Sequence, residues 1–110
     1  MASVAIYPGS FDPVTFGHLD VMKRATQIFD KVIVAATDNL QKKSLFTIQE
    51  RISMLKESTK GIRGLEIEVF SGLVIDFARK KKINVLIRGL RMFSDFEYEF
   101  QMALTNRRLD

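Results

Sequence analysis

Cysteine is absent from this chain of 110 residues, and its absence excludes several kinds of chemistry at once. The protein can form no disulfide, no thiolate metal site and no cysteine nucleophile. A sequence without cysteine is compatible with a reducing compartment, and we expect a cytoplasmic protein. Only one histidine is present. Because no cluster of residues has metal-ligand spacing, the sequence predicts no metal site built from protein side chains alone.

Long hydrophobic runs and familiar nucleotide fingerprints are also missing. No apolar stretch approaches the ~18 residues that a membrane-spanning helix needs. The amino end, Met1–Ile6, lacks the basic residues of a secretory signal, so neither a span nor a leader is expected. The sequence contains no Gly-x-Gly-x-x-Gly and no Walker lysine motif, which argues against NAD binding and P-loop chemistry. A Ser/His/acid triad cannot be assigned.

What remains is the composition of an ordinary globular protein, with 46% hydrophobic and 27% charged residues. The length predicts a single domain over residues 1–110. The formal net charge is +4, which would suit nucleic acid or a small anionic substrate. The basic residues are dispersed apart from a run at 79–82 and a pair at 107–108, without Arg-aromatic alternation. This pattern favours the small anionic substrate, so no nucleic-acid partner is expected.

Strand-like and helix-like segments alternate along the chain. The expected strands are residues 3–7, 31–37, 65–70 and 83–88. The expected helices are residues 17–29, 47 to about 61, 73–81 and 94 to about 108. Residues 31–37 are continuously apolar, as in a parallel strand buried on both faces, whereas 65–70 alternate with period two, as at a sheet edge. Thr47 with Glu50, and Ser94 with Glu97, are capping boxes that start helices.

This β-α order, repeated four times, predicts a doubly wound parallel α/β sheet with helices on both faces. In such a sheet, ligands bind beyond the carboxyl ends of the strands, where the direction of winding reverses. The loops at those ends are residues 8–18, 38–46, 71–74 and 88–93. We therefore look for candidate functional residues in these four loops.

The loop from Tyr7 to His18 is the most unusual stretch of the chain. It contains both prolines, two glycines and the only histidine. His18 is expected in the first turn of a helix, where exposed amides bind phosphate oxygens, and Ser10 adds a hydroxyl. Gly17 would let the backbone approach a ligand closely. A histidine without a role, and Asp12-Pro13 as simple turn residues, are the alternatives from local evidence.

Basic residues follow two other expected strands. Lys42 and Lys43 lie beyond the second, either as a charge for a substrate phosphate or as solvated lysines. Arg88 ends the fourth strand and Arg91 follows, and an arginine ending an apolar run needs an anion, from a ligand or from an internal carboxylate. Glu99, in the last expected helix, would reach a ligand or face solvent.

Five stretches together resemble the bacterial phosphopantetheine adenylyltransferase family of the nucleotidyltransferase superfamily. They are Tyr7–Pro13, Thr15–His18, Lys42–Lys43, Arg88–Arg91 and Asp95–Glu99. Thr-x-Gly-His alone is typical of nucleotidyltransferases in general. Its combination with Arg-Gly-Leu-Arg and Asp-Phe-Glu-Tyr-Glu is far more specific, and the resemblance extends from Ala5 to Arg108.

The resemblance implies a Rossmann-like fold and adenylyl transfer from ATP to 4′-phosphopantetheine, with Mg²⁺, giving dephospho-coenzyme A and pyrophosphate in a homohexamer. By position, the acceptor substrate would be bound by Ser10, Lys42, Val74 and Arg88. His18 would be catalytic and stabilise charge on the α-phosphate of ATP. The ATP site would be formed by Ser10, Phe11, His18, Gly89, Leu90, Arg91 and Glu99.

Family members continue past Asp110, so the resemblance also implies a chain shortened at its C-terminus. The part beyond would contain a further strand and a serine-rich stretch that binds ATP phosphates. Two alternatives to the adenylyltransferase stay open from the sequence. One is a cytidylyltransferase of the same superfamily, and the other is a shortened, non-catalytic fragment that binds phosphopantetheine or coenzyme A.

Overall fold

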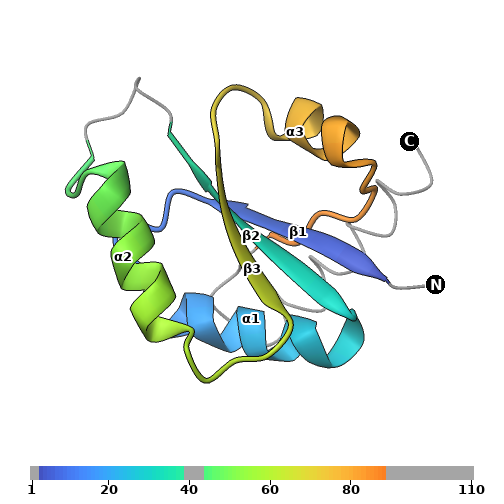
Figure 1. Ribbon diagram of the computed structural model, residues 1–110, viewed down its shortest axis with the longest axis horizontal. Helices are drawn as coiled ribbons and strands as arrows, with labels where there is room; N and C mark the ends of the chain where they lie inside the picture. Colours follow the sequence, from blue (N-terminus) through green and yellow to red (C-terminus); the bar gives the residue numbers. More distant parts are fainter. Residues whose placement is uncertain (1–2, 39–43, 89–110) are drawn as a thin grey trace.

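The computed structural model describes residues 3–38 and 44–88, which form a parallel sheet with helices on both faces (Figure 1). The three strands are β1 (Val4–Gly9), β2 (Lys31–Thr37) and β3 (Leu65–Phe70), hydrogen-bonded in the order β1-β2-β3. In the parallel register, Val4 lies opposite Lys31 and Val32 lies opposite Leu65. The described part therefore confirms the predicted parallel α/β architecture.

The helices are divided between the two faces of this sheet. Helices α1 (Phe16–Ile28) and α2 (Ile48–Ser58) cover one face, and α3 (Val74–Lys81) covers the other (Figure 1). Strand β2 is buried from Val32 to Ala36, because it lies in the middle of the sheet and its two faces are both covered. No helix within the described ranges is long and apolar enough to cross a membrane.

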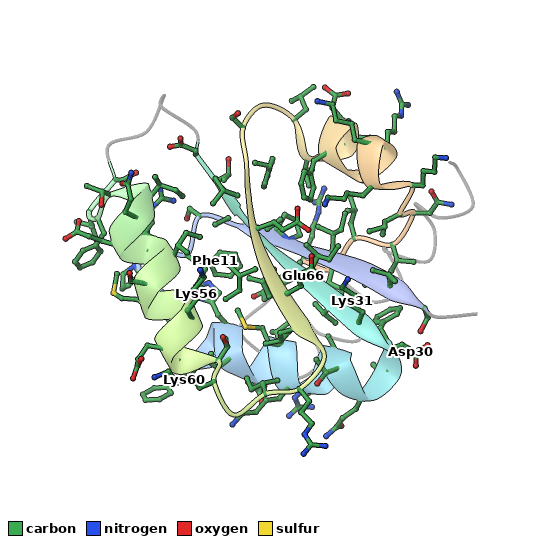
Figure 2. The ribbon with its side chains drawn as sticks, viewed as in Figure 1. Phe11, Asp30, Lys31, Lys56, Lys60 and Glu66 are labelled. Carbon is green, nitrogen blue, oxygen red and sulfur yellow. The ribbon has the colours of Figure 1, made fainter. Side chains whose placement is uncertain are left out.

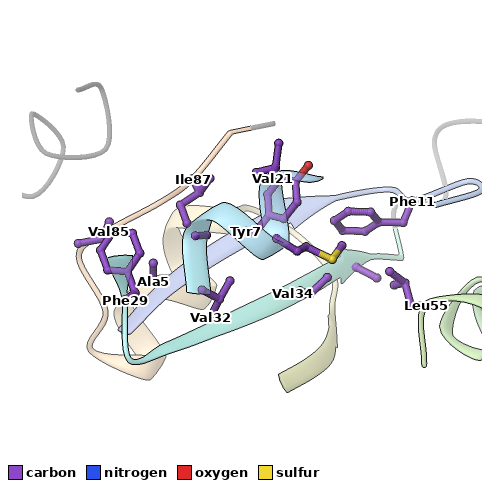
Figure 3. Packing of buried hydrophobic residues seen from close by; sticks show 13 residues of the cluster. Ala5, Tyr7, Phe11, Val21, Phe29, Val32, Val34, Leu55, Val85 and Ile87 are labelled. Atoms are coloured by element: carbon purple, nitrogen blue, oxygen red, sulfur yellow. The ribbon is translucent and has the colours of Figure 1, made fainter. Parts of the chain in front are cut away.

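Two apolar clusters follow from this arrangement. The larger cluster lies between the sheet and α1 with α2, and Figure 3 shows its buried members. The smaller one lies under α3 and includes Ile6, Ile33 and Phe70. Alternate side chains of β1 and β2 point to opposite clusters, as the period-two geometry of strands requires.

Strand β3 is the edge of the described sheet, as its alternating pattern predicted. On its α3 face it carries Glu66 and Glu68 before the buried Phe70 at its end. Glu66 pairs with Lys31 of the neighbouring strand (Figure 2), and Glu68 pairs with Lys81 of α3 at 2.6 Å. The hydrogen bond from Lys31 lowers the pKa of the Glu66 carboxyl. These ion pairs provide the edge strand with charge on that face.

Strand β1 is longer than the sequence predicted. The expected strand ended at Tyr7, but Pro8 and Gly9 continue the pairing, opposite Ala35 and Ala36. Proline can belong to this strand because its nitrogen is on the side away from β2, where no bond to β2 is required. Helix α2 differs in the other direction, since it ends at Ser58 rather than near residue 61.

The expected fourth strand, 83–88, forms only one bridge, between Ile6 and Leu86. Ile6 donates to the carbonyl of Val85 at 2.9 Å and accepts from Ile87 at 2.7 Å. In a parallel ladder the next bond would start from the nitrogen of residue 8, which is a proline without an N–H. The fourth β-α unit is thus not confirmed, and its helix from Ser94 lies outside the described residues.

The bridge still fixes where the chain reverses direction across the sheet. Segment 83–88 lies beside β1, on the edge opposite β2. From β1 the chain first winds to β2 and β3, then returns across β1 to this segment. The switch point is therefore between β1 and segment 83–88, and the loop after Gly9 and Arg88, at the end of that segment, lie at its carboxyl edge.

Candidate active site

His18 and Thr15 form a reciprocal cap at the start of α1. The Thr15 hydroxyl oxygen accepts from the backbone N–H of His18 at 3.3 Å. In return, Nδ1 of the His18 ring accepts from the backbone N–H of Thr15 at 2.9 Å. A backbone N–H can only donate, so Nδ1 carries no proton. The neutral ring then has its proton on Nε2, which leaves one N–H donor for a ligand.

The His18 ring rests against two buried aromatic rings. Its centroid is 5.0 Å from that of Phe11, in an edge-to-face arrangement, and 6.4 Å from that of Tyr7. The imidazole is half-buried, and this desolvation lowers its pKa below the usual 6.5. Burial likewise raises the pKa of the Tyr7 hydroxyl well above its usual range. Close to neutral pH, His18 is thus an uncharged hydrogen-bond donor held in one orientation.

The loop after β1 folds back over its own phenylalanine. Phe11 has a left-handed backbone, with φ 49°, and its side chain is only 1% exposed. Figure 3 shows it at the same end of the large cluster as Leu55. A Cβ at Gly9 would lie 3.0 Å from the Phe11 ring, which explains the glycine. The peptide bond between Asp12 and Pro13 is cis. This fold leaves Ser10 exposed at the loop's surface.

Asp12 connects this loop to the chain before α2. Its two carboxylate oxygens accept from the backbone N–H groups of Leu45, at 2.6 Å, and Phe46, at 2.8 Å. The sequence suggested only a turn for Asp12-Pro13, and that interpretation was incomplete. A carboxylate is needed here because both of its partners are backbone donors.

Arg51 was missed by the sequence analysis. It is 4% exposed, and its Nη1 donates to the carbonyls of Ser10, at 2.8 Å, and Thr37, at 3.0 Å. One signal was present in the sequence. Arg51 lies three residues after Ile48 and four before Leu55, on the apolar stripe of α2. A charged residue within such a stripe indicates a buried polar partner.

The other predicted site residues fall into two groups. Arg88 is exposed at the end of the segment beside β1, so it shares the carboxyl edge of the sheet with Ser10 and His18. Val74 is the first residue of α3 rather than part of a turn, and it packs against the smaller cluster. The remaining predicted residues lie outside the described residues: Lys42, Gly89, Leu90, Arg91 and Glu99.

Comparison with known proteins decides the family. The sequence model of a family described as cytidylyltransferase-like matches residues 6–110. Phosphopantetheine adenylyltransferase of Caldanaerobacter subterraneus is 58% identical over 97% of this chain and 67% of its own length. That of Desulfatibacillum aliphaticivorans is 56% identical over the whole chain and 63% of its own length. This chain belongs to the phosphopantetheine adenylyltransferase family.

A solved adenylyltransferase supports the fold assignment. Nicotinic acid mononucleotide adenylyltransferase of Plasmodium falciparum, complexed with NaAD, superposes with a TM-score of 0.61 at 18% identity. The match covers 82% of this chain and 52% of that one. At this identity the similarity concerns the fold alone, which is Rossmann-like. The chain itself spans about two thirds of the length of the two phosphopantetheine adenylyltransferases above.

A metal site made by the protein is not found in this member of the family, as far as residues 3–38 and 44–88 show. No group of three His, Asp or Glu residues there could hold an ion. Asp12, the carboxylate of the loop, already accepts two backbone hydrogen bonds. The donors present suit Mg²⁺ only if phosphates and water supply most of its ligands, which is common for this ion.

Proposed function

We propose that the protein transfers the adenylyl group of ATP to 4′-phosphopantetheine, releasing pyrophosphate and forming dephospho-coenzyme A. The observation that carries this proposal is the His18 ring, held by Thr15 as a neutral Nε2–H donor at the sheet's switch point. Family membership supports the choice of substrates. The relatives named phosphopantetheine adenylyltransferase are longer than this chain. We therefore propose, in addition, that the chain of 110 residues is itself active.

In the proposed reaction an oxygen of the phosphopantetheine phosphate attacks the α-phosphorus of ATP. A new P–O bond forms, and the bond from the α-phosphorus to the bridging oxygen of the β-phosphate breaks. Pyrophosphate leaves with that electron pair. The nucleophile is already an anion, so no general base is required. Catalysis then consists of aligning two anions and stabilising the charge that grows on the α-phosphate oxygens.

His18 suits the second task. Its Nε2–H donates to an α-phosphate oxygen, and the amides at the start of α1 favour negative charge at the same place. A neutral donor keeps its proton throughout the step. The depressed pKa of His18 is consistent with this role, because the reaction needs a hydrogen bond there and not a proton transfer.

We assign the remaining roles by position. Ser10, Lys42 and Arg88 hold the acceptor phosphate, and Val74 contacts the pantetheine arm. Phe11 has a buried ring, so its contribution to the ATP site comes from its main chain. Gly89, Leu90, Arg91 and Glu99 complete the ATP site. When bound, Mg²⁺ would neutralise charge on the nucleotide phosphates, held mainly by those phosphates and by water. We also propose a homohexamer located in the cytoplasm.

Pyrophosphate release tests the proposed function. The chain is mixed with ATP and 4′-phosphopantetheine, and in parallel with CTP and the same acceptor. Rapid release with ATP, and little with CTP, is the expected result. Release with CTP alone would indicate a cytidylyltransferase instead. Acceptor binding by calorimetry without any turnover would contradict the proposal and identify a binding protein.

A further inference from the structure

Arg51 is a buried cation that the proposed reaction does not use directly. Its side chain is inaccessible at 4% exposure, so a substrate cannot reach it without displacing the loop above. No carboxylate forms an ion pair with it among residues 3–38 and 44–88. Its Nε is also buried without a hydrogen-bond partner in that part of the chain. A guanidinium in this state lowers stability unless something else offsets its desolvation.

Its place in the helix adds to that cost. Arg51 is in the first turn of α2, which starts at Ile48, and the helix dipole there favours anions over cations. The capping carboxylate of Glu50 already interacts with the backbone of Thr47. Helix stability therefore does not explain a cation at residue 51, and the explanation lies in what the guanidinium contacts.

Those contacts join two strand ends. One nitrogen, Nη1, donates both to the carbonyl of Ser10, after β1, and to that of Thr37, the last residue of β2. Asp12 adds a second connection, from the β1 loop to the N–H groups of Leu45 and Phe46. The chain that leaves β2 and the chain that enters α2 are thus both tied to the loop carrying Ser10.

We propose that Arg51, together with Asp12, is a positioning residue for binding of the acceptor phosphate. The pair fixes the Ser10 loop relative to both ends of the segment 38–44, and the charge of Arg51 beneath that loop attracts the dianionic phosphate. The inference rests on the proposed function. Arg51 and Asp12 touch no substrate, but they set the geometry and the electrostatic potential of the site that binds the acceptor phosphate.

Three substitutions test this. Arg51→Lys keeps the charge but lacks the planar fork, Arg51→Gln removes the charge, and Asp12→Asn weakens the tie to Leu45 and Phe46. Each should raise KM for 4′-phosphopantetheine, by about tenfold for Arg51→Lys and up to about a hundredfold for Arg51→Gln. KM for ATP should rise by a smaller factor than KM for the acceptor, since the same loop also contributes Ser10 and the main chain of Phe11 to the proposed ATP site.

Thr59→Ala is the matched control. Thr59 is buried at the other end of α2, where its hydroxyl donates to the Leu55 carbonyl, far from the loop in sequence. This variant should lower Tm without changing KM for the acceptor. A second readout is calorimetry with 4′-phosphopantetheine and with pantetheine, which lacks the phosphate. The Arg51 and Asp12 variants should weaken only the binding of the phosphorylated compound.

The outcomes separate the two proposals. If the unaltered chain neither binds the acceptor nor turns it over, the proposed function is wrong and this inference falls with it. If the unaltered chain is active, equal rises in KM for both substrates, or effects no larger than those of Thr59→Ala, overturn the inference alone. Should the Arg51 variants fail to fold, Asp12→Asn decides by the same two measurements.

Discussion

At the scale of single residues, one hydrogen bond sets the chemistry of the site. The backbone N–H of Thr15 occupies Nδ1 of His18, and that contact determines which ring nitrogen can donate to a ligand. Phe11 supports the ring from the side, and Gly9 leaves room for Phe11. These neighbouring residues thus fix the tautomer and the orientation of the His18 ring before any substrate binds.

Replacing His18 tests its role. His18→Ala should lower kcat by about a hundredfold or more while KM for either substrate changes little, because the contact strengthens in the transition state. Steady-state kinetics provide the measurement. His18→Gln is a useful companion, since glutamine at this position can still accept from the Thr15 N–H and keep the helix cap. An unchanged kcat in His18→Ala would exclude the assignment.

His18 should also make stability depend on pH. Its pKa is lowered in the folded protein, so the unfolded chain binds this proton more readily. The resulting stability is fully present above the unfolded pKa of about 6.5 and is lost as pH falls through the lower folded value. Urea denaturation from about pH 7.5 to about pH 5 should show a larger loss in the unaltered protein than in His18→Gln. If the unfolding free energies of the two proteins changed equally with pH, burial would not lower the pKa of His18.

At the scale of elements, two helices begin with the same kind of cap. Thr47 and Glu50 start α2 in the way the sequence predicted, with bonds of 3.1 Å and 2.9 Å. Thr15 and His18 start α1 in the same geometry. The capping box of Thr15 and His18 was not predicted, because the residue at its N3 position is usually glutamate or glutamine and not histidine. Both caps position helix amino ends at the carboxyl edge of the sheet.

Removing the cap of α2 should be costly. Thr47→Ala should lower the free energy of unfolding by about 1 kcal/mol, because the N–H of Glu50 loses its acceptor. Thr47→Ser keeps a hydroxyl and should stay within about 0.5 kcal/mol of the unaltered protein. Urea denaturation of both variants gives the comparison. Equal losses in the two would show that the hydroxyl bond contributes little.

At the scale of the whole molecule, the sheet separates two apolar clusters. Met22 belongs to the cluster under α1 and α2, and Ile33 belongs to the one under α3. Both side chains are almost fully buried, at 0% and 4% exposure. Because the sheet lies between the two clusters, we expect each face to be packed independently of the other.

This separation predicts additive stability changes. Met22→Ala should cost about 2–5 kcal/mol and Ile33→Val about 0.5–1.5 kcal/mol, from lost burial and the cavities left behind. The double variant should equal the sum within about 0.5 kcal/mol, since the two sites share no cluster. Chemical denaturation of the three variants measures the coupling. A larger coupling energy would show that the two faces of the sheet repack together.

Much of this protein is determined by its sequence alone. The apolar run 31–37 predicted a doubly covered strand, the alternation at 65–70 predicted an edge, and Thr47-x-x-Glu50 predicted a cap, because such signals act between near neighbours. The residues of the nucleotidyltransferase motifs also stood at the ends of expected strands. The family that these motifs predicted is confirmed by the matching family model and by the similar relatives.

Only the tertiary structure revealed how the site is held together. Arg51 meets Ser10 across 41 positions of the chain, and Asp12 meets Phe46 across 34, distances at which no local pattern operates. The Nδ1 acceptor of His18 and the burial of Phe11 likewise depend on the folded loop. The limited pairing of segment 83–88 depends on Pro8 of another strand. Periodicity selects which face of an element is buried, whereas buried polar groups find their partners only when the chain has folded.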